Sequence, residues 1–214
     1  MTDSLLREII LTGGAFLLLF LYHLHLRYTK RRHPASTSFA RNAQTRAVWV
    51  KEIMQNGRDI LAVQTLRNWT MASSLLASTA ILIALATLNV ALTGEKSSEI
   101  SHFLNFFGSK SEGVRLIKFL VLSFDFFFAF FNFTLAIRYY NHVGFMINVP
   151  PGPESLVDHK YVAETLNLGA AHYTLGMRGF YLAIPLTLWL LGPTWLLVGN
   201  AFLVVILYRL DRSG

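Results

Sequence analysis

Four long apolar stretches, separated by polar and mostly basic connections, set the pattern of this chain. They run over approximately residues 5–27, 71–93, 115–138 and 179–208. A helix rises about 1.5 Å per residue, so stretches of this length can cross a hydrocarbon core about 30 Å thick. The apolar residues are continuous rather than alternating, which argues against a β-barrel. We therefore predict an all-α integral membrane protein, a single domain over residues 1–214 with four transmembrane helices.

The connections predict further helices at the cytosolic or interfacial surface. Apolar positions recur every three or four residues between 39 and 55, which indicates an amphipathic helix lying on the membrane face or packed beneath the bundle. Asn56-Gly57 ends it, and the second long helix begins near Ile60. A rigid elbow at residues 149–153 precedes a helix that leads into the fourth span. The apolar cluster at residues 100–107 predicts an interfacial helical turn.

Composition and charge support the assignment to membrane proteins and predict the orientation of the helices. Hydrophobic residues make up 53% of the chain and charged residues only 14%, which does not suit a soluble domain of this size. Cysteine is absent, so disulfides, thiolate metal sites and thiol catalysis are excluded. Most arginines and lysines lie between residues 27 and 67 and in the third connection. The positive-inside rule then predicts cytosolic first and third connections and both termini outside, in the plasma or inner membrane. Membrane lipids explain this basic excess better than nucleic acid does.

The third span carries a polar stripe within a run of phenylalanines. Every seventh residue from Lys118 is polar, giving Asp125, Asn132 and Tyr139, and small or aliphatic residues occupy the alternate positions. We expect this stripe to face protein or water and the phenylalanines to face outward. An ionisable side chain in a span marks a functional site by default, so Asp125 is a candidate ion ligand or proton carrier. The alternative is that Asp125 and Asn132 only join helices by hydrogen bonds.

The second and fourth spans leave similar choices open. Small residues at positions 73, 77, 80, 84, 87 and 91 predict a groove for close helix packing, or else a narrow pore wall. Pro185 and Gly192-Pro193 predict a kink inside the fourth span, which in transporters can free carbonyl groups to hold an ion. Near the cytosolic ends, His23 or His25 with His142 or His172 is a candidate haem pair. No metal, nucleotide or catalytic-triad motif is present, so we predict no cofactor.

Three segments carry a resemblance to a known family: LAVQTLRNWTMASSLLAST from Leu61, IRYYNHVGFMINVP from Ile137 and GMRGFYLAIPLTLWLLGP from Gly176. They resemble a plant and bacterial membrane-protein family known as domain of unknown function 599. The resemblance implies about four spans and no established activity. It highlights residues near the cytosolic helix ends, namely Arg67, Asn68, Arg138, Tyr139, Tyr140, Asn141, His142 and Arg178.

These features favour a homo-oligomeric ion channel or channel-like transporter that is not an enzyme. Asp125 and Asn132 would act within the membrane, with Lys118 at the outer mouth. Near the inner mouth would lie Arg67, Asn68 and Arg138. The candidate gating elements, which would open and close the pathway, are the helix around Trp49 and the elbow at residues 149–153. Two alternatives stay open. One is a haem-binding redox or lipid-modifying enzyme that uses Tyr139, Tyr140, His142 and His172, and the other is a scaffold that binds lipid.

Overall fold

The computed structural model describes residues 2–32, 38–57, 59–93, 111–149 and 157–212. The helices are α1 (Thr2–Arg32), α2 (Ser38–Asn56), α3 (Asp59–Thr93), α5 (Glu112–Met146), α6 (His159–Trp189) and α7 (Pro193–Arg212). Every regular element within these ranges is a helix, which confirms the predicted all-α fold. The turn predicted at residues 100–107 and most of the predicted elbow lie outside the described residues.

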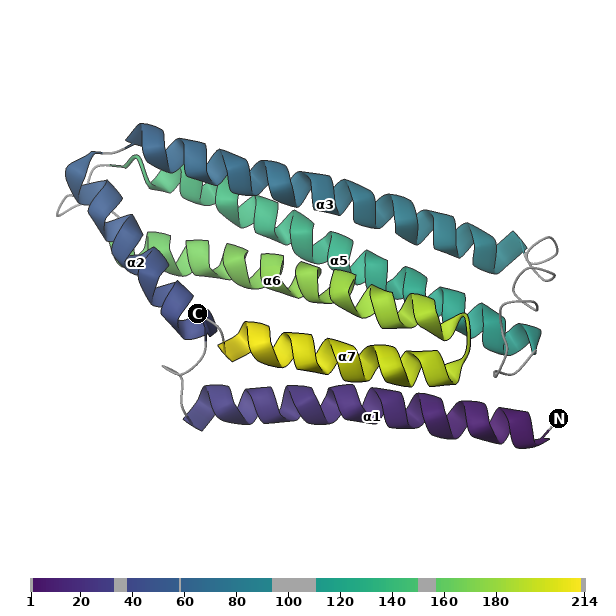
Figure 1. Ribbon diagram of the computed structural model, residues 1–214. Coiled ribbons are helices and arrows are strands. Elements are labelled where there is room, and N and C mark those ends of the chain that lie inside the picture. The colour runs from purple at the N-terminus through teal and green to yellow at the C-terminus, as the bar shows by residue number, and fades with distance from the viewer. Residues whose placement is uncertain (1, 33–37, 58, 94–110, 150–156, 213–214) are drawn as a thin grey trace.

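The long helices lie side by side along one axis (Figure 1). Neighbouring contacts run in the order α3, α5, α6, α7, α1, while α2 crosses one end of the bundle. Four of these helices, α1, α3, α5 and α7, are long and apolar enough to cross a membrane. The chain therefore has the helices of a membrane protein, arranged as an open row whose outer members expose much of their apolar surface.

Small side chains allow α3 to pack closely on α5. Ser73, Ala77, Ala80 and Ala84 are buried, and the hydroxyl of Ser123 donates a hydrogen bond to the Ala84 carbonyl at 2.8 Å. Without bulky side chains on this stripe, the two helix backbones approach closely. The packing interpretation of the stripe is thus confirmed, and the residues predicted as an alternative pore wall face α5 of the same chain.

The region predicted as a single fourth span is two antiparallel helices. Pro185 lies inside α6 without ending it, and α6 stops at Trp189. Gly192 then adopts a φ of 141°, and Pro193 begins α7. Glycine tolerates this backbone angle, and proline can start a helix because its first turn needs no N–H donor. The prediction of one kinked span over residues 179–208 is therefore wrong: Gly192-Pro193 forms a turn between two helices.

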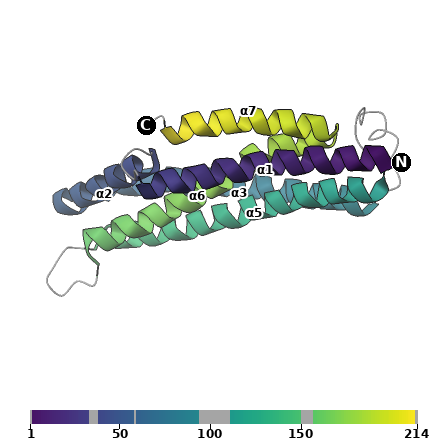
Figure 2. The ribbon, with the colours of Figure 1, turned by 90° about the horizontal axis from the view of Figure 1, so that it is seen from below.

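This turn changes where the chain ends. Both views place the N-terminus at one end of the bundle and the C-terminus at the other, next to α2 (Figures 1 and 2). The predicted arrangement, with both termini on the same side, does not fit this fold. The reason is the extra reversal at Gly192, which gives α7 its own passage along the bundle.

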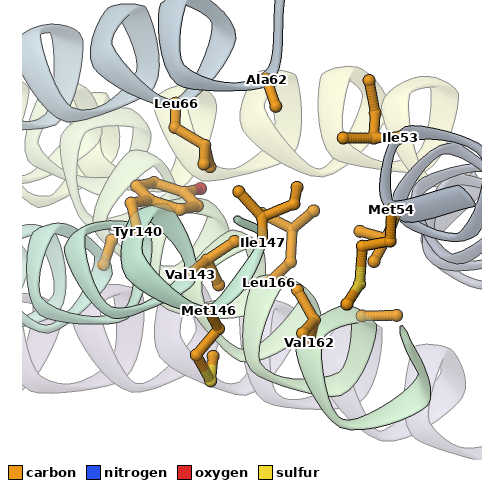
Figure 3. Close-up of a cluster of buried hydrophobic side chains, with 13 residues drawn as sticks. Ile53, Met54, Ala62, Leu66, Tyr140, Val143, Met146, Ile147, Val162 and Leu166 are labelled. Carbon is orange, nitrogen blue, oxygen red and sulfur yellow. The ribbon is translucent and has the colours of Figure 1, made fainter. Parts of the chain in front are cut away.

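The predicted amphipathic helix α2 is anchored beneath the bundle by an apolar cluster (Figure 3). Val50, Ile53 and Met54 are buried, and they pack with residues of α3, α5 and α6. Figure 3 shows Ile53 and Met54 directed toward Ile147, Val162 and their neighbours. Of the two predicted positions for this helix, the one packed against the bundle is the one observed.

Replacement of Gly176 tests the close approach of α5 and α6. A Cβ atom at Gly176 would lie 2.8 Å from two ring atoms of Phe133, whose side chain is fully buried. We expect Gly176→Ala to lower the free energy of unfolding by about 1–3 kcal/mol, because the ring has to move. The measurement is reversible unfolding of the purified protein in detergent.

Gly144→Ala is the matched control, since a Cβ there meets nothing within 4 Å. Alanine restricts the unfolded chain more than glycine does, so this variant should gain about 0.5–1 kcal/mol. Equal effects of the two variants would contradict the packing described for Gly176.

Candidate functional site

The polar stripe of α5 faces the inside of the bundle. Lys118, Asp125 and Asn132 are 2%, 7% and 6% exposed, and Leu122, Ala129, Ala136 and Val143 between and beyond them are buried. Phe124 and Phe131 on the opposite side are exposed, although Phe126 and Phe133 are buried as well. The predicted orientation of this stripe is confirmed: its polar and small residues face protein.

A buried ion pair lies at the end of the bundle that holds the N-terminus. Nζ of Lys118 is 2.8 Å from Oε1 of Glu8 on α1, and the two side chains are 3% and 5% exposed. The Trp189 indole N–H donates to the same oxygen at 3.1 Å, and Nζ lies 5.5 Å from the centre of the indole ring. Charges this deeply buried are costly unless paired. Lys118, which the sequence predicted at the outer mouth of a pathway, is therefore buried and neutralised inside the protein.

Asp125 occupies the next position of the stripe, beside Gly179 of α6. A Cβ at Gly179 would lie 3.1 Å from that of Ala129 and 3.6 Å from Oδ1 of Asp125, so only a glycine fits easily. Oδ2 of Asp125 is buried, and no hydrogen bond reaches it from the described residues. Buried carboxylate oxygens are normally paired, so this one marks a place where a proton, a cation or a water molecule would bind.

Asn132 connects α5 to a histidine on α6. Its Nδ2 donates to the Phe128 carbonyl at 2.9 Å, which leaves Oδ1 to accept from Nδ1 of His172 at 3.0 Å. The imidazole of His172 stacks on Tyr139, with ring centres 5.5 Å apart and planes within 10° of parallel. Since Nδ1 carries the hydrogen, Nε2 is the basic nitrogen of the neutral ring. The group combines an imidazole ring with two residues of the polar stripe.

A second, partly buried polar network joins the helices at the other end of the bundle. Arg178 of α6 donates to both carboxylate oxygens of Asp211, at 2.5 and 2.8 Å, and the Tyr22 hydroxyl donates to Asp211 at 2.5 Å. The Ser38 hydroxyl donates to the carbonyls of Leu210 and Asp211. One carboxylate thus joins α1, α6 and α7, and the start of α2 is bonded to the end of α7.

The other predicted residues do not join these groups. The exposed ones are Arg67, Asn68, Arg138, Asn141 and His142. Tyr140 is buried in the apolar cluster of Figure 3, away from exposed His142. His23 bonds its own helix at the Leu19 carbonyl. In the part of the chain that the structure describes, only Tyr139 and His172 of the predicted redox cluster contact each other.

Sequence reasoning missed Glu8, Trp189, Tyr22 and Asp211. Glu8 lies in the first turns of an apolar helix, where an acidic residue is itself an indication of a buried partner. Asp211 lies at the end of the chain and gives no comparable indication.

Breaking the ion pair from one side should cost more than removing it from both. We expect Lys118→Met to lower the free energy of unfolding by about 3–5 kcal/mol, because Glu8 is left charged and buried. The double variant Lys118→Met with Glu8→Gln should recover most of this loss, since the new amide side chain is neutral and still accepts from Trp189. Unfolding in detergent measures both. The exposed Arg7→Met is the control, and strictly additive losses from Lys118→Met and Glu8→Gln would contradict the pairing.

Comparison with known proteins identifies the family of this chain. No curated protein and no solved structure matches the chain. The model of one family, described as a protein of unknown function, DUF599, matches residues 10–214. That match includes α3, α5, α6 and α7 and nearly all of the polar groups above. The chain therefore belongs to the DUF599 family.

Proposed function

We propose that the protein moves protons across the membrane along the polar row inside each protomer. The observation that carries this proposal is the buried Oδ2 of Asp125, which has no partner among the described residues. A carboxylate in such a site gains most from binding a proton or a cation.

The spacing of the polar groups supports a relay. Lys118, Asp125, Asn132 and Tyr139 follow one another at seven-residue intervals, which is about 10 Å along a helix. Direct transfer does not cover that distance, so ordered water would complete the path between them. Asp125 would hold the proton in the middle of the span, and His172 would exchange it toward the end near α2.

The surroundings favour a proton over a hydrated ion. Leu122 and Ala129, next to Asp125 along the stripe, are buried and apolar. A hydrated ion needs a continuous polar passage, whereas a proton needs only a few water molecules. Anions are disfavoured as well, because Glu8 compensates the charge of Lys118. The sequence did not distinguish cation passage from anion passage. The pairing of Lys118 with Glu8 favours a positively charged species.

The path runs within one chain and not along an axis between subunits. Asp125 and Asn132 face α6 of the same protomer, as Gly179 and His172 show. Assembly into a homo-oligomer stays a prediction, and this path does not require it. The exposed apolar faces of α1 and α3 would contact lipid or other copies of the chain.

The orientation follows from the charges at the two ends. Arg209 and Arg212 at the end of α7 lie at the same end of the bundle as α2, which adds to the basic excess there. By the positive-inside rule this end faces the cytosol, with the N-terminus outside and the C-terminus inside. We infer the plasma or inner membrane as the location.

Substitution of Asp125 tests the proposal. Asp125→Asn keeps the size of the side chain and removes its proton site, so proton flux should fall by about a hundredfold. Flux is measured in proteoliposomes by an internal pH-sensitive dye, under a potential imposed with potassium and valinomycin. Glu112→Gln removes the same charge from an exposed position of α5 and should leave the flux unchanged.

Two results would count against the proposal. Folded wild-type protein that carries no proton flux or current would favour a scaffold role. Equal flux in Asp125→Asn and wild type would remove Asp125 from the path. Planar-bilayer recording of the same preparations under a salt gradient separates proton movement from cation conductance by the reversal potential.

A further inference from the structure

A cavity of about 290 Å³ lies under α2, between α6 and α7. Its size is near the lower end of sites that hold small molecules, about 300 Å³. Ser38, Phe39, Asn42 and Arg46 line it from α2, and residues around Arg178 and Leu210 line it from the other two helices. The cavity is thus formed only because α2 is held against the bundle.

Two arginines on different helices line this cavity. Arg46 of α2 donates from Nε to Oδ1 of Asn167 at 2.7 Å, and Arg178 of α6 uses Nη2 to bind Asp211. A guanidinium carries five N–H donors. No hydrogen bond within the described residues occupies the remaining donors of either side chain. Each arginine is therefore oriented by one protein partner and keeps donors for a second one.

The charges around the cavity do not balance. Of the two arginines, Asp211 compensates Arg178, which leaves Arg46 without a carboxylate among the described residues that line the cavity. Burial lowers the pKa of the Arg46 guanidinium, although an arginine stays charged at neutral pH. An anion in the cavity would replace the hydration that Arg46 has lost. The site is matched to one negative charge.

We propose that this cavity binds the phosphodiester group of an anionic membrane phospholipid. Arginine forks match the oxygens of a phosphate, and basic pockets between helices at the cytosolic side bind such headgroups. The lining also contains Met177, Leu207 and Leu210, which suit the glycerol and the upper acyl chains. Phe39 and Leu210 are exposed at the rim, where a lipid would continue into the bilayer.

Two features of the cavity favour a lipid over free phosphate. The cavity is lined by α2, which crosses the end of the bundle that we assign to the cytosolic side, where the leaflet supplies anionic headgroups at high local concentration. Its apolar side chains would gain nothing from free phosphate. This inference does not depend on proton movement, because it concerns Arg46 and α2 and not Asp125.

Native mass spectrometry of the full-length protein tests it. The protein is loaded from mixed micelles with equal phosphatidylglycerol and phosphatidylcholine, and the lipids retained on the folded protein are counted. We expect one phosphatidylglycerol to be retained in preference to phosphatidylcholine by about tenfold, because both lipids carry the phosphodiester but the choline ammonium of phosphatidylcholine would place a further positive charge near Arg46 and Arg178. Millimolar inorganic phosphate should not displace it.

Three variants locate the site. Arg46→Gln removes the unmatched charge, and Thr174→Phe fills the cavity from an exposed lining position without changing a charge. Both should bring the preference close to parity. Lys51→Gln, an equal change of charge at an exposed position of α2, should retain it. Thr174→Phe decides the question if loss of the Asn167 contact unfolds Arg46→Gln.

Equal retention of the two lipids by wild type would overturn the proposal, as would an unchanged preference in Thr174→Phe. Displacement by inorganic phosphate as efficiently as by lipid would overturn the choice of source, since free phosphate would then be the ligand.

Discussion

Polar side chains inside a membrane bundle have little access to bulk water, so the packing of neighbouring helices has to supply most of their partners, and the contact between α5 and α6 does so for Asn132. Glycines at 169, 176 and 179 bring the backbone of α6 against α5, and a Cβ atom at any of them would crowd side chains of α5. The same close approach puts His172 beside Asn132 and leaves Asp125 enclosed. The part of the candidate site around Asp125 and Asn132 is a consequence of this helix pair, whereas Lys118 is paired with Glu8 of α1.

The reversal at Gly192 determines which residues the last turn of α7 contacts. Because α7 returns along α6, its last turn meets Arg178, Tyr22 and the start of α2. Asp211 then holds these helices together as a shared acceptor. Without the turn, the end of the chain would lie at the opposite end of the bundle and this network could not form.

The helix α2 connects the proposed lipid site to the proposed proton path. It is anchored by an apolar cluster at its end and by the Ser38 and Arg46 hydrogen bonds along its length. Arg46 bonds Asn167, which lies five residues before His172 on α6. A lipid bound beneath α2 would therefore act on the helix that carries the proposed proton acceptor next to Asn132.

By itself the sequence determined the helical membrane class, the extent of α2 and α3, the position of α5, and the inward direction of the polar stripe, because these depend on periodicities local to one helix. It could not identify the partners of that stripe. Lys118 binds Glu8 and Arg178 binds Asp211 across long stretches of chain, and no local pattern specifies such pairs. Gly192-Pro193 fits a kink or a turn equally well in sequence. Only the packing of α7 back onto α6 decided it, because that packing buries an apolar face which a continuous span would leave exposed.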